Sequence, residues 1–260
     1  MRKTTKLLFG LLVTAALQSS GPAAGQSFLA NNGVLYEATS DEGGATVVVD
    51  GLFRFYRDIY PPLPDSLRLA FEAAESPFDD VAFVLATHRH GDHMHPEAIA
   101  SFLCAAPEAV ALVPEEIRDE VEAAAGCGAA ADRLVTGTEA VERGGVTVRA
   151  VPVPHVNPDR FASIQNRAYV IESASGRIVH LGDSDLSEEL AAESIDVLTT
   201  PFWNIGEDRF MRLWERAGRP YLIAVHVSPG DHERLRSRYR ELGLDVWVPE
   251  LPLETGRDRD

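Results

Sequence analysis

The chain has 260 residues, of which 24 are lysine or arginine and 40 are aspartate or glutamate, so its formal net charge is −16. The length suits one large domain or two small ones, and a hydrophobic content of 45% is sufficient for a core. So acidic a surface repels phosphate backbones, which argues against a nucleic-acid partner.

The N-terminus has the pattern of a secretory signal peptide over residues 1–25. Three basic residues precede a short apolar segment: Arg2, Lys3, Lys6 and Leu7–Leu17. The segment is too short to span a bilayer, so we expect cleavage before Gln26, with retention as a membrane anchor as the second alternative. Residues 26–260 would then form a single exported domain, periplasmic or secreted, with no stable membrane insertion after the signal is removed.

Removal of the signal peptide would change both the charge balance and the redox environment. The basic count falls from 24 to 21 against 40 acidic residues, a net charge of −19, and no lysine remains. Schiff-base chemistry on a lysine is therefore excluded. Cys104 and Cys127 would meet an oxidising compartment, where we expect them to pair; the alternative is two small buried thiols.

Apolar patterns predict strands and helices along the rest of the chain. In the first half, strands are expected at Gly33–Ala38, Ala45–Asp50, Val81–Ala86 and Ala109–Val113, and helices at Ser66–Glu75, Pro96–Ala105 and Pro114–Ala125. In the second half, strands are expected at Val146–Pro154, Ala168–Glu172, Arg177–Leu181, Val197–Thr200 and Tyr221–Val225, and helices at Ser187–Ala192, Glu207–Ala217 and Pro229–Leu242. There is no fixed internal repeat and no sign of a second core, so one domain is expected.

Three histidines and one aspartate stand close together directly after a predicted apolar strand. His88 and His90 are two residues apart, so an extended backbone points both to the same side. Gly91 lets the chain turn and direct Asp92 and His93 toward a second centre. Neutral imidazole and carboxylate are the ligands that Zn²⁺ and related ions prefer. The cluster therefore predicts a metal site rather than a solvated polar turn.

Three further ligand-type residues follow predicted strands: His155, Asp183 and His226. Side chains at strand ends can meet in a shared cleft at the edge of a sheet. Taken alone, each has an ordinary explanation: His155 as a loop residue, Asp183 as a helix N-cap and His226 as a hydrogen-bonded strand end. The other histidines are expected outside the site: His95 in an exposed loop, His180 packed in a strand and His232 solvated on a helix.

In this order and context, the residues resemble the metallo-β-lactamase superfamily over essentially the whole mature chain. The resemblance rests on Asp50 at a strand end, the motif His88-x-His90-x-Asp92-His93, and then His155, Gly182-Asp183 and His226. It implies an α/β (α+β) fold, a four-layer αβ/βα sandwich with two mixed β-sheets and the metals at one edge. It also implies a role for each residue: His88, His90 and His155 on the first metal, Asp92, His93 and His226 on the second, Asp183 as a bridge, and Asp50 bracing the metal loop.

The resemblance implies a hydrolase with two divalent metal ions, zinc being the first expectation and manganese or iron the alternatives. Two metals about 3.5–4 Å apart would hold a bridging hydroxide that attacks a carbonyl or phosphorus centre. Asp92 is the candidate catalytic residue and would shuttle protons beside the nucleophile. The layout resembles the compact single-domain branch that hydrolyses lactones and phosphodiesters. The expected substrate is therefore a small ester, lactone, amide or phosphodiester.

Other functions and the substrate-binding residues stay open at this point. β-Lactam hydrolysis is compatible with export, and a non-catalytic periplasmic zinc-binding protein would need the same ligands. Redox use of the site with iron ranks last, because no flavin domain is attached. The candidates for the mouth of the site are the aromatic loop Phe53–Pro64, Trp203 and Asn204, with Arg54, Arg57, Arg89, Arg160 and Arg167 for an anionic group. The oligomeric state is also open.

Overall fold

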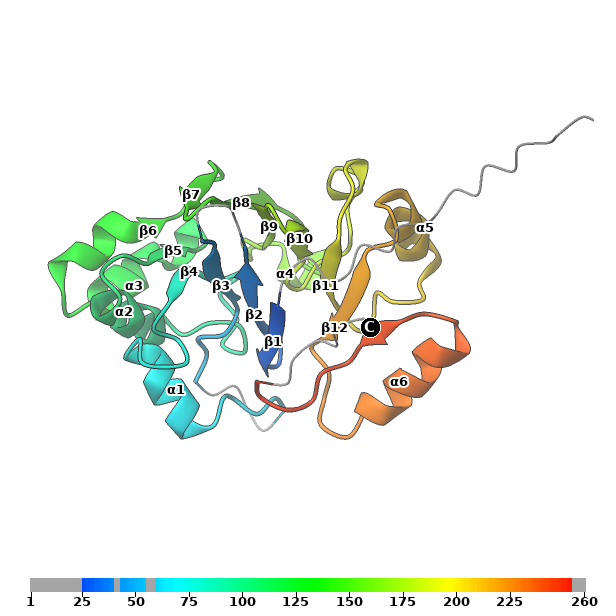
Figure 1. Cartoon of the computed structure of the whole chain (residues 1–260), viewed down its shortest axis with the longest axis horizontal. Helices are drawn as coiled ribbons and strands as arrows, with labels where there is room; N and C mark the ends of the chain where they lie inside the picture. The colour runs from blue at the N-terminus through cyan, green and yellow to red at the C-terminus, as the bar shows by residue number, and fades with distance from the viewer. Residues whose placement is uncertain (1–24, 40–42, 55–58, 254–260) are drawn as a thin grey trace, which may run out of the picture.

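Two mixed β-sheets face each other at the centre of the molecule (Figure 1). The computed structural model describes residues 25–39, 43–54 and 59–253. The strands of the first sheet are β1 (Gly25–Ala30), β2 (Gly33–Ala38), β3 (Ala45–Val49), β4 (Val81–Leu85), β5 (Val110–Leu112) and β6 (Leu134–Val135). They lie in sequence order; β1, β2 and β3 are antiparallel, whereas β3 to β6 are parallel.

The second sheet is built from the C-terminal half of the chain. Its strands are β7 (Val141–Arg143), β8 (Val146–Pro152), β9 (Arg167–Ser173), β10 (Gly176–His180), β11 (Val197–Pro201), β12 (Tyr221–Val225) and β13 (Val246–Trp247). The order is β13-β12-β11-β10-β9-β8-β7. Strands β7 to β10 pair antiparallel and β10 to β13 pair parallel, so β8, β10 and β12 run in the same direction.

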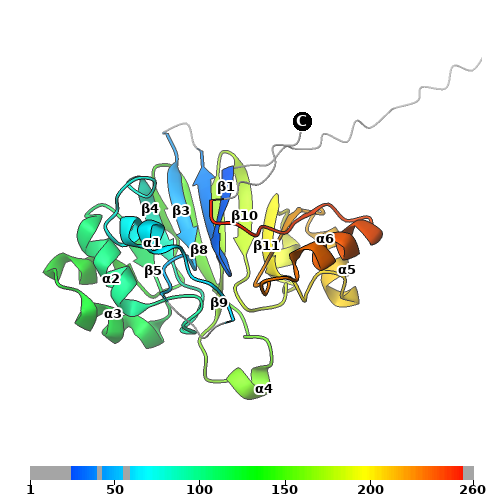
Figure 2. The same ribbon diagram turned by 90° about the horizontal axis from the view of Figure 1, so that it is seen from below.

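Helices cover the outer faces of both sheets (Figures 1 and 2). On the first sheet lie α1 (Asp65–Glu72), α2 (Pro96–Ala105) and α3 (Arg118–Ala124), and on the second lie α5 (Asp208–Arg216) and α6 (His232–Glu241). The short α4 (Pro158–Phe161) projects from the body in Figure 2. Three 3-10 turns complete the description: η1 (Glu115–Ile117), η2 (Gly128–Arg133) and η3 (Leu190–Ala192).

The core is divided into three apolar layers because successive strand residues point to opposite faces. In β3, Val47 and Val49 pack between the sheets, while Val48 packs under the helices of the first sheet. On the far side, Leu222 of β12 packs with Phe210 of α5 in the third layer. Helices, sheet, sheet and helices therefore follow one another, which confirms the predicted four-layer αβ/βα sandwich.

The predicted elements are largely present, with differences where segments are short. Ser187–Ala192 was expected to be helical but contains only the 3-10 turn η3. The helix predicted at Pro114–Ala125 is divided into η1 and α3. Strands β1, β6, β7 and β13 and helix α4 were not predicted, and most of them are too short to show a periodicity.

Two predictions about single residues have clear outcomes. Cys104 of α2 is disulfide-bonded to Cys127, which confirms the expected pairing. His232 was expected to be solvated, and this was wrong: it is only 8% exposed. The reason is the orientation of α6, whose buried face contains Leu235 and Tyr239 as well as His232, at helical spacing.

The predicted signal peptide lies outside the described residues except for Gly25, which opens β1. Its assignment therefore stays a prediction. Within the described ranges, every helix is too short or too polar to cross a membrane.

Candidate metal centre

The loop after β4 carries His88, His90, Asp92 and His93 at the edge where β3 and β4 end. Asp50 directly follows β3 and lies in the left-handed region of the backbone, with φ 51°. Its carboxylate accepts hydrogen bonds from the backbone N–H of Thr87 at 2.8 Å and from the Thr87 hydroxyl at 2.7 Å. The end of one strand thus fixes the start of the neighbouring loop.

The second sheet delivers the other three predicted ligands from three strands that run in one direction. His155 follows β8, Asp183 follows β10 and His226 follows β12. Gly182 has φ 58°, and a Cβ there would lie 2.6 Å from the Cβ of Thr87. Only glycine allows this approach, so the residue before Asp183 is required for the two sheets to meet at the site.

The structure brings the seven predicted ligands together in two neighbouring groups. One group is His88, His90, His155 and Asp183, and the other is Asp92, His93 and His226; within each group the ligand atoms lie within 4.8 Å of one another. In the first group, Nδ1 of His90 is 2.8 Å from Nε2 of His88 and 3.3 Å from Nε2 of His155. In the second, Nε2 of His226 is 3.5 Å from Oδ2 of Asp92.

Asp183 lies between the two groups. Its Oδ2 is 3.6 Å from Nε2 of His155 in the first group and 3.4 Å from Nε2 of His226 in the second. Its Oδ1 is 3.5 Å from Nε2 of His93. One carboxylate therefore faces both sets of nitrogens, as a bridging ligand would.

Hydrogen bonds at Nδ1 leave the Nε2 atoms of three histidines directed at the cluster. His93 Nδ1 donates to Oδ2 of Asp50 at 2.8 Å, and His155 Nδ1 donates to the carbonyl of Val156 at 2.7 Å. His88 Nδ1 is 3.0 Å from the hydroxyl of Thr87. This hydroxyl already donates its proton to Asp50, so its oxygen can accept a hydrogen bond from His88 Nδ1. Such partners fix the tautomer and the ring orientation of metal-binding histidines.

The electrostatic environment keeps several of these imidazoles neutral. Burial and then the charge of His93 hold the pKa of His88 well below its ordinary value. Burial also lowers the pKa of His90 to about 4 and reduces that of His155. Neutral rings present lone pairs to a cation. Burial would raise the pKa of Asp183, but the neighbouring histidines, led by His93, outweigh it and hold that pKa well below its ordinary value, so the carboxylate is ionised.

Two buried polar atoms in the cluster are suited to coordinate a cation. His93 Nε2 and Asp183 Oδ1 lie 3.5 Å from each other, and neither makes a well-formed hydrogen bond with the residues that the structure describes. Burying a polar atom without a partner is costly, and a coordinated cation would remove that cost. The donor set of imidazole nitrogens and carboxylate oxygens suits zinc, manganese or iron.

A family model described as a beta-lactamase superfamily domain matches residues 35–216, most of the chain and six of the seven clustered residues. The chain belongs to the metallo-β-lactamase superfamily. Family and cluster together identify a metal-dependent hydrolase of this superfamily. A comparison with curated protein sequences gives no match.

Solved structures share the metallo-β-lactamase fold at low sequence identity. A possible metal-dependent hydrolase from Veillonella parvula DSM 2008 is 17% identical, with TM-score 0.64, over 89% of this chain and 98% of that one. An isothiocyanate hydrolase from Delia radicum gut bacteria is 14% identical, with TM-score 0.62, over 90% and 98%. The metallo-beta-lactamase fold protein YhfI from Bacillus subtilis is 14% identical, with TM-score 0.59, over 90% and 99%.

Sequence reasoning missed a buried polar network beside this superfamily motif. Asn32 Nδ2 donates to Oδ2 of Asp50 at 2.9 Å and lies 3.1 Å from Nε2 of His180. The hydroxyl of Tyr36 is 2.9 Å from Nδ1 of His180 and 2.6 Å from Oγ1 of Thr199. The network joins the two sheets, and it confirms that His180 is packed in a strand rather than among the ligands.

Three aromatic rings surround the histidines of the cluster. The rings of Tyr60 and Trp203 lie edge-on to His226, at 4.6 and 5.0 Å between centroids. The ring of Phe161 in α4 is 5.1 Å from His90 and 4.5 Å from that of His155. Trp203 and the loop containing Tyr60 were among the predicted candidates for the mouth, whereas Phe161 was missed because α4 is a single turn.

Most arginines considered for an anionic substrate group are engaged elsewhere. Arg54 pairs with Glu72, Arg89 lies near Glu116 and Glu120, and Arg167 donates to the carbonyls of Val113 and Thr136. Arg57 lies outside the described residues. Arg160, 5.0 Å above the ring of Phe161, is the arginine beside the aromatic rim formed by the rings of Tyr60, Phe161 and Trp203. Asn204 donates to the carbonyl of Ser184 and to the hydroxyl of Thr200, and so supports the chain beyond Asp183.

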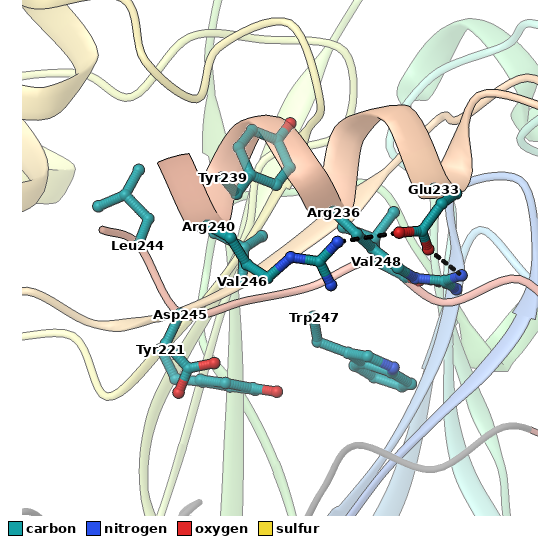
Figure 3. A pocket seen from close by; sticks show the side chains of 10 residues that line it. All are labelled: Tyr221, Glu233, Arg236, Tyr239, Arg240, Leu244, Asp245, Val246, Trp247 and Val248. Carbon is teal, nitrogen blue, oxygen red and sulfur yellow. Dashed lines mark hydrogen bonds and ion pairs between the residues drawn. The ribbon is translucent and has the colours of Figure 1, made fainter. Parts of the chain in front are cut away.

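His95, the last histidine considered in the sequence, and a large pocket are not part of the cluster. His95 precedes α2 and pairs with Glu97. A pocket of about 610 Å³ lies between α6 and β13 (Figure 3). There Glu233 pairs with both Arg236 and Arg240. None of the predicted ligands lines this pocket, so no part of the metal chemistry is assigned to it.

Proposed function

We propose that the protein is an exported dinuclear metal-dependent hydrolase that cleaves a small ester, lactone, amide or phosphodiester. The observation that carries the proposal is the carboxylate of Asp183, which lies within 3.6 Å of His155 and 3.4 Å of His226 and so joins two groups of ligands. Export is supported by the signal-peptide pattern of residues 1–25 and by the disulfide between Cys104 and Cys127, because disulfides persist in oxidising compartments.

Each clustered residue has a role in this proposal. His88, His90 and His155 would hold the first ion, Asp92, His93 and His226 would hold the second, and Asp183 would contribute to both. Bound divalent ions would lower the pKa of a water molecule that they bind, and they would polarise the carbonyl or phosphoryl group of a substrate. Most of these side chains are buried, so bulk water is kept away from the reacting centre.

Asp92 is the proposed proton carrier. Its Oδ2 lies 3.5 Å from Nε2 of His226 and 3.4 Å from Nδ2 of Asn31, so the carboxylate is held at the edge of the cluster. A carboxylate in that place can accept a proton from the attacking water and return it to the leaving group. The residue is only 4% exposed, so few competing proton donors reach its side chain.

The aromatic rim supports substrates with an apolar body. Tyr60, Phe161 and Trp203 present rings beside the ligand histidines, where they can pack against the non-reacting part of a small molecule. Arg160 at the same rim can pair with an anionic substituent. β-Lactams fit this description as well as lactones do, so both belong in the test.

The experiment combines metal analysis with a hydrolysis panel on the mature protein. We expect about two metal ions per chain, and turnover of a lactone, β-lactam, ester or phosphodiester that is lost with a chelator and regained with Zn²⁺. Asp183→Asn should lower turnover by at least about a hundredfold, whereas the exposed Asp185→Asn serves as the matched control. Full metal loading without turnover across the panel would instead indicate a zinc-binding protein without catalytic activity.

A further inference from the structure

The turn between β1 and β2, Asn31–Asn32, lies against the metal cluster. Asn31 has φ 48°, a left-handed conformation that asparagine tolerates better than most residues. The next residue, Gly33, is packed so closely that a Cβ there would lie 3.0 Å from the carbonyl oxygen of Asp50. The turn is thus held firmly in place beside the metal loop.

Asn31 contacts two ligands that come from different sheets. Its Nδ2 donates to the carbonyl of Asp92 at 2.9 Å and lies 3.4 Å from Oδ2 of the same residue. Its own carbonyl accepts a hydrogen bond from the backbone N–H of His226 at 3.0 Å. One residue therefore restrains a ligand of the first sheet and a ligand of the second, both in the same group.

Asn32 reaches the third member of that group. Its Nδ2 lies 3.4 Å from Nδ1 of His93 and donates to Asp50, the carboxylate that accepts from the same His93 nitrogen. In the described part of the chain, no hydrogen bond joins either asparagine to the members of the other group: His88, His90, His155 and Asp183. The contacts of the turn are confined to one half of the centre.

We propose that the Asn31–Asn32 turn is a positioning element that selectively sets the affinity of the second metal subsite, formed by Asp92, His93 and His226. The proposal rests on the dinuclear site of the proposed function. Residues that orient metal ligands commonly change metal affinity tenfold to a hundredfold when they are replaced. Because the turn contacts only one group, its replacement should separate the two binding steps instead of weakening both.

The test is a titration of the metal-free full chain with Zn²⁺ alone, repeated with Co²⁺ so that absorption spectra report the coordination at each step. Asn31→Gly keeps a residue that accepts φ 48° and removes the amide. We expect the dissociation constant of the subsite formed by Asp92, His93 and His226 to rise by roughly tenfold or more, with that of the other subsite changed less than about twofold. Thr46→Val is the control, because it removes a partly buried hydrogen bond from β3 to Asp80, away from the ligands.

The outcomes separate this proposal from the proposed function. Suppose that the wild type binds two ions. If Asn31→Gly then weakens both binding steps equally, or changes neither, the positioning role is overturned and the dinuclear site stands. A wild type that binds one ion would overturn both. Binding at the subsite that the turn does not contact reports folding within the same experiment. If Asn31→Gly does not fold, Asn32→Ser is judged by the same ratio of dissociation constants.

Discussion

Asp50 shows how a single buried carboxylate organises the centre without belonging to the predicted ligands. It accepts hydrogen bonds from Thr87, Asn32 and His93, and it is only 1% exposed. Burial would raise its pKa, but the charge and hydrogen bond of His93 outweigh burial and lower the pKa, so the carboxylate is ionised. An ionised acceptor at Nδ1 raises the basicity of the opposite nitrogen of His93.

The replacement Asp50→Asn tests this role at the scale of one residue. An amide has one oxygen acceptor and no charge, so the Nδ1 proton of His93 loses its anionic partner. We expect metal affinity to fall by roughly tenfold to a hundredfold, measured by competition with a chromogenic chelator. The exposed Asp79→Asn is the control. Wild-type affinity in the Asp50 variant would contradict the role assigned to this carboxylate.

At the scale of elements, α1 is tied to the segment after β3 by a partly buried ion-pair cluster. Glu72 of α1 is 2.9 Å from a guanidinium nitrogen of Arg54 and 2.9 Å from one of Arg68. Burial would raise the pKa of Glu72, but hydrogen bonds from Arg54 and Arg68 outweigh burial and lower it. A carboxylate with a lowered pKa in the folded state stabilises the protein at neutral pH.

The sign of the pH dependence follows from that lowered pKa. The contribution of Glu72 is fully present above the unfolded pKa of about 4.3 and is lost as the pH falls through the lower folded value. The difference in unfolding free energy between wild type and Glu72→Gln should therefore be largest near pH 7 and shrink below about pH 4. Urea unfolding across this range measures this difference, with the exposed Glu75→Gln just after α1 as control. A difference that is constant with pH would show that the ion pairs do not act as described.

The longer strands could be predicted because they are visible as apolar runs, whereas the four-layer arrangement was predicted only from the resemblance to the metallo-β-lactamase superfamily. The shortest elements could not: β6 and β13 have two residues each, and two residues contain no period. Strand β1 was missed for another reason, since it begins at Gly25, where the signal-peptide pattern ends.

The candidate site likewise has a part that could be predicted from the sequence and a part that could not. His88–His93 form a motif within one short window after a strand, so both the ligands and their location at a strand end could be predicted. Asn31 and Asn32 look like any hairpin turn until the strands are paired, because the contact of Asn31 with Asp92 and that of Asn32 with His93 each span 61 positions. The burial of His232 depends on which face of α6 meets the sheet, and that helix has too few apolar residues to reveal it.

At the scale of the whole molecule, the centre lies across the seam between the two sheets. The first sheet provides the residues after β4, and the second provides His155, Asp183 and His226. Bound ions would therefore cross-link the two halves of the sandwich. Two of the buried atoms that would face such ions, His93 Nε2 and Asp183 Oδ1, come from the two different sheets.

Removal of metal should consequently lower the thermal stability of the whole domain. A ligand at about a thousand times its dissociation constant stabilises the native state by about 4 kcal/mol, which corresponds to roughly 10 °C in Tm for a domain of this size. Calorimetry before and after dialysis against a chelator measures the shift, and excess Zn²⁺ should restore the original Tm. Identical melting of the two forms would exclude metal binding across the seam.

The clustered residues are far apart in the sequence, and this separation determines when the site is complete during synthesis. While the polypeptide is being synthesised, the residues from His88 to His93 emerge long before His226, which closes the cluster only when β12 has joined the second sheet. A nascent or unfolded chain offers an incomplete set of donors. The complete set of donors therefore exists only once the chain has folded.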